Sequence, residues 1–225
     1  MEITYYGHAS LGIVINGFHL LVDPFISGNP KASQIDINTL KADYILLTHA
    51  HFDHIQDVEA LAKRTNAALI ANHEIVTYYE QKGFSGHPMN PGGSREFEFG
   101  TLKVVPAIHS SSFPDGTYGG NPVGFVLKGA SKTVYISGDT ALTMDMKLIP
   151  MFHQIDLAVF PVGGNFTMDV SEAIIASDFV ACNRVLGTHF DTAALIEIDH
   201  EAAQNKFREK GKELILLDIG GSLQV

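Results

Sequence analysis

The stretch of sequence that decides the fold is YILLTHAHFDH, residues 44–54. Its first half is a short apolar run typical of a buried strand, and its second half places three imidazoles and one carboxylate within six positions. A strand end that opens into a loop can direct several side chains at one point. Imidazole nitrogens and carboxylate oxygens are ligands that zinc and similar divalent ions prefer. We therefore predict that His49, His51, Asp53 and His54 form the centre of a metal site.

Outside this stretch the chain has two halves of similar design, each beginning with strands and continuing with strands that alternate with helices. In the first half, Asn16-Gly17 is a strong hairpin signal between two apolar strands. Predicted strands cover residues 2–6, 11–15, 18–22, 44–47, 67–71, 96–99, 102–106, 123–127, 133–136, 157–160, 185–186 and 214–217, and predicted helices cover 58–63, 75–81, 171–180 and 200–209. Two such halves can pack sheet on sheet with helices outside. The pattern predicts an α/β fold, a four-layer α/β/β/α sandwich, in a single domain over residues 1–225.

The composition favours a soluble protein that acts on a small-molecule substrate. Hydrophobic residues make up 45% of the chain, which is enough for a sizeable core. The formal net charge of −10 argues against nucleic-acid binding and against an anionic membrane as partner. The lone cysteine, Cys182, cannot form an internal disulfide, which fits a reducing compartment. Because we find no secretion signal and no long apolar span, we expect a cytoplasmic protein, and the sequence leaves homo-oligomer formation open.

Further motifs follow predicted strands or hairpins along the rest of the chain. They are Leu21-Val22-Asp23-Pro24, His109 after the strand 102–106, Ser137-Gly138-Asp139-Thr140, and Gly187-Thr188-His189. In this order, and with the pattern His49-x-His51-x-Asp53-His54, they resemble the metallo-β-lactamase superfamily over nearly the whole chain. The opening Tyr6-Gly7-His8-Ala9-Ser10 and the stretch from Pro161 to Met168 resemble a small branch of predicted metal-dependent hydrolases related to ascorbate-6-phosphate lactonase.

The resemblance implies a metal-dependent hydrolase in which two divalent ions share an activated hydroxide. The implied ligands are His49, His51 and His109 for one ion and Asp53, His54 and His189 for the other, with Asp139 bridging both. Asp23 would orient the loop that carries the histidines. Nitrogen and oxygen ligands without cysteine suit zinc or manganese, and also iron or nickel. The expected substrate is a small ester, lactone or phosphodiester.

The sequence leaves several roles and two other functions open. Asp53 could also pass a proton to the leaving group, and His8, at the end of a predicted strand, could act as a catalytic or as a structural residue. Segment 110–121, which follows His109, could be a mobile rim that contacts the substrate or a plain surface connection. The other functions are a mononuclear iron dioxygenase that acts on persulfides and a non-catalytic metal-binding regulatory domain. The complete set Asp53, His54 and His189 favours two ions and hydrolysis.

Overall fold

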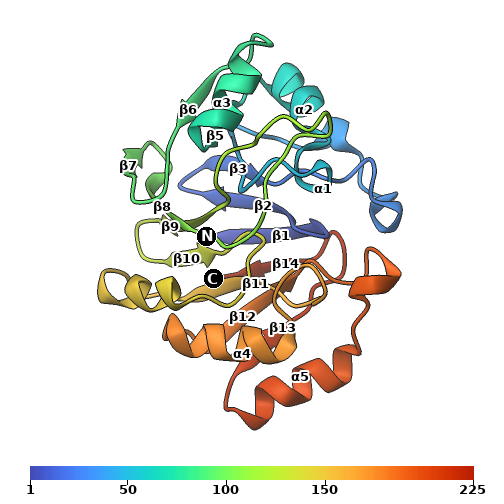
Figure 1. The fold of residues 1–225 in the computed structure, drawn as a ribbon, viewed down its shortest axis with the longest axis vertical. Coiled ribbons are helices and arrows are strands. Elements are labelled where there is room, and N and C mark those ends of the chain that lie inside the picture. The colour runs from blue at the N-terminus through green and yellow to red at the C-terminus, as the bar shows by residue number, and fades with distance from the viewer.

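The computed structural model describes residues 1–225 and contains two seven-stranded sheets that pack face to face (Figure 1). The first sheet has the strand order β14-β1-β2-β3-β4-β5-β6, and the second has the order β13-β12-β11-β10-β9-β8-β7. The strands of the first sheet are β1 (Glu2–Gly7), β2 (Ser10–Ile15), β3 (Phe18–Val22), β4 (Tyr44–Leu46), β5 (Ala68–Ala71), β6 (Gly86–Pro88) and β14 (Ser222–Gln224). Those of the second are β7 (Ser94–Phe97), β8 (Gly100–Pro106), β9 (Val123–Lys128), β10 (Thr133–Ile136), β11 (Leu157–Pro161), β12 (Arg184–Thr188) and β13 (Glu213–Ile215).

Helices cover the outer face of each sheet, so that the molecule has four layers (Figure 1). Three helices lie on the first sheet: α1 (Phe52–Ile55), α2 (Val58–Thr65) and α3 (His73–Glu80). Two lie on the second: α4 (Val170–Phe179) and α5 (His200–Glu209). Short 3-10 helices are η1 (Pro30–Ala32), η2 (Ile37–Thr39), η3 (Met144–Met151) and η4 (Ala194–Ile196). The predicted α/β/β/α sandwich is confirmed, and none of these helices has the length and apolar character needed to cross a membrane.

The strand directions place many strand ends at the same edge of the sandwich. Each sheet is antiparallel in its first strands and parallel in its later ones, so that β1 runs in the direction of β3 and β4, and β8 in that of β10 to β12. The hairpin between β2 and β3 turns at Asn16 and Gly17, whose φ angles of 50° and 84° are those of a two-residue type I′ turn. The loops that follow β1, β3, β4, β8, β10 and β12 therefore all leave from corresponding ends.

The apolar core has two parts, one on each face of the first sheet. The larger part fills the space between the sheets and continues beneath α4 and α5, where Ala176 and Phe207 are fully buried. The smaller part lies between the first sheet and helices α2 and α3, and includes Leu69 and Ile75. β1 buries alternate residues, whereas β11 buries all of its residues, because the first sheet covers one face of β11 and α4 covers the other.

Apart from the four short 3-10 helices, three elements were absent from the sequence prediction: β6, β14 and α1. β6 contains Gly86 and Pro88, residue types that are depleted in strands, and both β6 and β14 are three-residue strands at a sheet edge. α1 is a single helical turn, which is too short to show a helical period. The pairing of β14 with β1 brings the chain ends together, with Val225 N donating to Met1 O at 3.0 Å (Figure 1).

Candidate metal centre

The predicted site residues converge from both sheets, although they are far apart in the sequence. The first sheet supplies His8, directly after β1, and the residues after β4, which are His49, His51, Asp53 and His54. The second sheet supplies His109 after β8, Asp139 after β10 and His189 after β12. The site therefore lies where the strand ends of the two sheets meet, and each half of the chain contributes only part of it.

A first group of possible ligands consists of His49, His51 and His109, whose ligand atoms lie within 4.8 Å of one another. His49 Nε2 is 3.0 Å from His51 Nδ1, and the His109 ring centroid is 5.1 Å from that of His49. A tetrahedral ion with bonds of about 2.0 Å needs its ligand atoms about 3.3 Å apart. The 3.0 Å spacing of the His49 and His51 nitrogens is close to that value, and His109 offers a third nitrogen within 4.8 Å, so the group can share one ion.

Hydrogen bonds through Asp23 determine which nitrogen of two histidines faces the site. Thr48 Oγ1 donates to Asp23 Oδ2 at 2.6 Å, so it is left to accept from His49 Nδ1, 3.0 Å away. His54 Nδ1 is 2.9 Å from the same Asp23 oxygen and donates to it. In both rings Nδ1 is hydrogen-bonded away from the site, so that Nε2 is the nitrogen that faces it. Asp23 thus orients His54 directly and His49 through the hydroxyl of Thr48.

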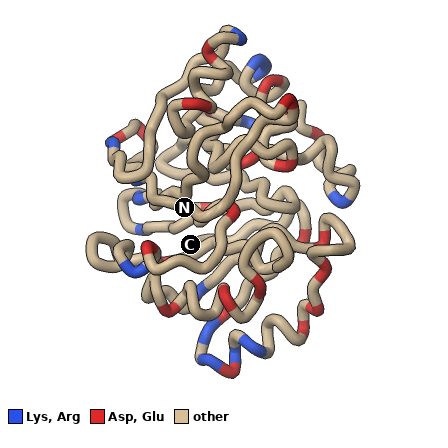
Figure 2. The backbone as a smooth tube through the Cα atoms, in the orientation of Figure 1, with Lys and Arg blue, Asp and Glu red and all other residues tan.

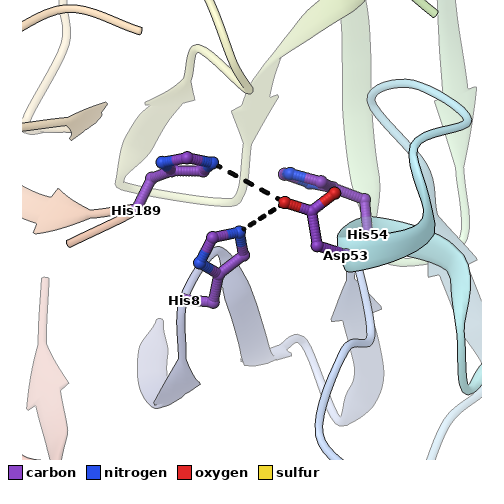
Figure 3. A group of neighbouring side chains, drawn as sticks. All are labelled: His8, Asp53, His54 and His189. Atoms are coloured by element: carbon purple, nitrogen blue, oxygen red, sulfur yellow. Dashed lines mark hydrogen bonds and ion pairs between the residues drawn. The ribbon is translucent and has the colours of Figure 1, made fainter. Parts of the chain in front are cut away.

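A second group of possible ligands consists of His8, Asp53, His54 and His189. Figure 3 shows the Asp53 carboxylate between the imidazole rings of His8 and His189, with a dashed line to each. Asp53 Oδ2 lies 3.0 Å from His8 Nε2 and 3.9 Å from His189 Nε2. Asp53 is 39% exposed, whereas the His8 and His189 side chains are 3% exposed. Among these three side chains, that of Asp53 is therefore the one most open to solvent.

Asp139 lies between the two groups. Its Oδ2 atom is 3.3 Å from His54 Nε2, 3.1 Å from His189 Nε2 and 3.7 Å from His109 Nε2. His109 belongs to the first group, whereas His54 and His189 belong to the second. One buried carboxylate is thus within ligand spacing of both groups.

The buried nitrogen of His54 provides a test of whether a metal fits. His54 is fully buried, and its Nε2 atom makes no hydrogen bond of good geometry, although Asp139 Oδ2 lies 3.3 Å away. A buried polar atom without a partner is costly unless a ligand satisfies it. A divalent ion bound by imidazole nitrogens and carboxylate oxygens would satisfy it, so the donor set present fits a metal.

The histidines and aspartates of the cluster shift one another's pKa values. Burial would lower the pKa of His54, but the carboxylates of Asp139 and Asp23 outweigh burial and raise that pKa well above its ordinary value. Burial would raise the pKa of Asp139, but His54 and His189 hold it well below its usual range. Burial lowers the pKa of His49, so this ring is neutral and ready to bind a metal.

The His8 ring lies between Asp53 and Thr192, a residue that sequence analysis did not single out. Burial lowers the pKa of His8 to about 4, so the ring is neutral at pH 7. His8 Nε2 then donates to Asp53 Oδ2 at 3.0 Å, and His8 Nδ1 accepts from Thr192 Oγ1 at 3.0 Å. No motif pointed to Thr192, which follows His189 by three positions. The geometry admits His8 both as a metal ligand and as the residue that orients Asp53.

Segment 110–121 is anchored to the body of the protein rather than free. Phe113 is buried and stacks on Tyr78 of α3 with ring centroids 3.7 Å apart. Asn72 Nδ2 donates to Gly119 O at 2.7 Å and so ties the far end of the segment to the start of α3. At its near end the Ser110 hydroxyl lies 3.2 Å from His51 Nε2, and the Ser111 hydroxyl accepts from Ala50 N at 3.1 Å.

The fold and the histidine-aspartate cluster together define a protein of the metallo-β-lactamase fold. A family model described as the β-lactamase superfamily domain matches residues 19–190. Among solved structures, the chain is similar to Igni18, a metallo hydrolase from the hyperthermophilic archaeon Ignicoccus hospitalis. The TM-score is 0.90 at 30% identity, covering 99% of this chain and 97% of that one.

Curated relatives identify the family more closely. A UPF0173 metal-dependent hydrolase of Flavobacterium johnsoniae is 64% identical over 225 residues, which is the full length of both chains. One from Bacillus subtilis is 42% identical over 90% of this chain and 91% of its own. The chain therefore belongs to the UPF0173 metal-dependent hydrolases of the metallo-β-lactamase superfamily. The superfamily prediction is confirmed, and the closer link to ascorbate-6-phosphate lactonase stays a prediction.

Proposed function

We propose that this protein hydrolyses a small ester, lactone or phosphodiester with two divalent ions, zinc or manganese in preference to iron or nickel. The proposed ligands are His49, His51 and His109 for one ion and Asp53, His54 and His189 for the other, with Asp139 between them. The observation that carries the proposal is the position of Asp139 Oδ2, 3.1 Å from His189 Nε2 and 3.7 Å from His109 Nε2. One carboxylate within reach of both ligand groups favours two ions held side by side.

The chain's own residues have separate tasks in this scheme. When bound, the ions would supply an activated water at neutral pH and a positive charge that stabilises negative charge developing on the substrate. Asp53, whose side chain is 39% exposed, would take a proton from the attacking water and pass it to the leaving group. His8 orients that carboxylate through the 3.0 Å contact with its Nε2 atom. Asp23 and Thr48 keep the lone pairs of His49 and His54 directed inward.

The proposed setting is a single catalytic domain that acts on a soluble small molecule in the cytoplasm. A reducing compartment fits the lone, buried Cys182, which has no partner for a disulfide. The net charge of −10 favours a small-molecule substrate over nucleic acid.

Metal analysis combined with a substrate panel tests the proposal. Protein purified without added metal, and the same protein after loading, is analysed for metal content and assayed with lactones, bis-p-nitrophenyl phosphate and persulfides. We expect about two ions per chain and hydrolysis of an ester, lactone or phosphodiester. One iron per chain with oxygen uptake on persulfides would instead indicate a dioxygenase. Bound metal without turnover of any substrate class would indicate a regulatory domain.

A variant and a matched control complete the test. Asp139→Ala should lower the metal content to one ion or fewer and abolish turnover. Asp156→Ala is the control, because this carboxylate accepts from Thr133 N at 2.8 Å in the same sheet and contacts no residue of the candidate site. An Asp139→Ala protein that keeps two ions and normal turnover would refute the arrangement.

A further inference from the structure

Four large apolar side chains are exposed on segments that carry candidate ligands or adjoin them. They are Phe52, Ile108, Phe166 and Leu195, with exposed fractions of 53%, 52%, 54% and 66%. Most large apolar side chains of this protein are buried in the two cores. Exposed apolar groups that gather at one place mark binding surfaces for ligands or partners.

Two of the four side chains adjoin candidate ligands in the sequence. Phe52 stands between His51 and Asp53, at the start of α1. Ile108 immediately precedes His109. The apolar surface of these two residues is therefore next to the part of the cluster that is open to solvent, where Asp53 is 39% exposed.

The loop of Phe166 contacts the cluster through the backbone, and Leu195 follows a candidate ligand in the sequence. Phe166 lies in the loop between β11 and α4, where Met168 N donates to Thr140 O, the residue after Asp139, at 3.0 Å. Gly163, in the same loop, lies so close to His189 that a Cβ atom there would be 2.2 Å from its carbonyl oxygen. Leu195 lies in η4, six positions after His189.

The backbone that presents these side chains is ordered by hydrogen bonds and packing. Ile108 N donates to Thr140 Oγ1 at 3.0 Å, and Ala141 N donates to Ile108 O at 3.0 Å. The Phe52 ring packs edge-on against Phe25, with centroids 5.8 Å apart. A rim of fixed shape binds an apolar group at a lower entropic cost than a flexible loop does.

The charges near the cluster do not favour a phosphorylated substrate. Every ion pair formed by the site residues joins a histidine to an aspartate, and none involves lysine or arginine. Figure 2 shows lysine and arginine mainly at the margins of the molecule, with a group near the end of α5. Apart from the proposed metal ions, a phosphate group on the substrate would find no lysine or arginine paired with these residues, and phosphate recognition commonly uses such side chains.

We infer that Phe52, Ile108, Phe166 and Leu195 form an apolar rim that binds an uncharged acyl or alkyl group beside the bond to be cleaved. The substrate is then a hydrophobic ester or lactone rather than a phosphorylated one, an assignment that rests on the proposed hydrolase function. Each methylene that the rim removes from water should tighten binding by about twofold to fourfold.

Calorimetric binding of hydrolysis products tests the rim without requiring turnover. Butyrate, hexanoate and octanoate are titrated into the metal-loaded protein, and the dissociation constant is expected to fall about twofold to fourfold per methylene. Phe166→Ser and Leu195→Ser should each reduce this dependence on chain length and leave the metal content unchanged. The matched control is Phe152→Ser, because Phe152 is 79% exposed after η3 and should leave the dependence unchanged.

The same series of acids as 4-nitrophenyl esters separates this inference from the proposed function. A chain-length dependence in binding without hydrolysis of any of these esters, or of any lactone or phosphodiester in the panel above, would support the rim and refute the hydrolase proposal. Hydrolysis at rates that do not change with chain length, or a dependence that survives both rim variants, would overturn the rim. A dimer in sedimentation that dissociates on Phe166→Ser, with no chain-length dependence, would also overturn it, because the rim would then contact a second copy of the chain.

Discussion

Replacement of Asp23 by asparagine tests how the site is organised, because the buried carboxylate accepts from three donors. These are Thr48 N at 2.8 Å, Thr48 Oγ1 at 2.6 Å and His54 Nδ1 at 2.9 Å. Asparagine has the same shape but a single accepting oxygen, so its NH2 group would meet donors. If the amide oxygen accepts from Thr48 N, the NH2 group faces His54 Nδ1, and His54 avoids this conflict only by moving its proton to Nε2, the atom that faces Asp139; the opposite amide orientation leaves Thr48 N without an acceptor.

The expected size of the effect follows from these contacts. Loss of an orienting partner weakens metal binding by about 10–100-fold, and we expect this change for the ion held by His54. Loss of two hydrogen bonds to a buried charge costs about 3 kcal/mol of unfolding free energy. At roughly 2–4 °C per kcal/mol for a chain of this size, Asp23→Asn should lower the melting temperature by about 6–12 °C.

Metal affinity and thermal unfolding are measured together for Asp23→Asn and for a matched control. Asp57→Asn is that control, since Asp57 is also buried and accepts from Ile26 N at 2.6 Å, Ser27 N at 2.8 Å and the Ser27 hydroxyl, but binds no histidine. Asp57→Asn should lower the melting temperature and leave the metal affinity of the folded protein unchanged. The reasoning fails if Asp23→Asn binds both ions as tightly as the parent protein, or if both variants lose metal equally.

Three further outcomes are expected. His8→Ala should retain both ions and reduce turnover, by about 10²–10⁴-fold if His8 is itself an acid or base, measured by elemental analysis and steady-state kinetics; loss of an ion would make His8 a ligand. Asp53→Asn should regain only part of its activity when excess metal restores the second ion, because the proton carrier stays missing, whereas full rescue would make Asp53 a ligand only. Metal removal should lower the melting temperature, and increasingly so above pH 6.5. The raised pKa of His54 in the metal-free fold stabilises that fold below pH 6.5, and this contribution is lost as pH rises through the raised value. A melting temperature of the metal-free protein that does not fall as pH rises would contradict this.

The sequence predicted the fold class and the members of the cluster because both leave strong local signals. The type I′ hairpin at Asn16-Gly17 and the alternation of strands and helices are visible in single segments. The site residues each follow a predicted strand, and strands that run in one direction end at one edge. Order along the chain therefore carried information about proximity in space.

The remaining features depend on contacts between distant segments, which no single stretch reveals. Thr192 reaches His8 across 184 positions, and Asn72 holds Gly119 across 47 positions. The apolar rim gave no sequence signal, because a phenylalanine beside a metal ligand looks the same whether it is buried or exposed. Segment 110–121 was rich in small residues, but the stacking of Phe113 on Tyr78 anchors it.

The backbone at three site residues explains how the two halves form one centre. His8, Asp23 and His189 have φ angles of 55°, 44° and 54°, a left-handed conformation that costs a non-glycine residue about 1–2 kcal/mol. Each follows a strand end directly, and the turn there redirects the chain at the site. His189 N donates to His8 O at 2.8 Å, so two of these residues join the first sheet to the second. Glycine at these positions would relieve the strain but would remove the side chain that the site needs. Because neither sheet holds a complete ligand set, a metal at this junction would bind the two halves together as well as serve the reaction.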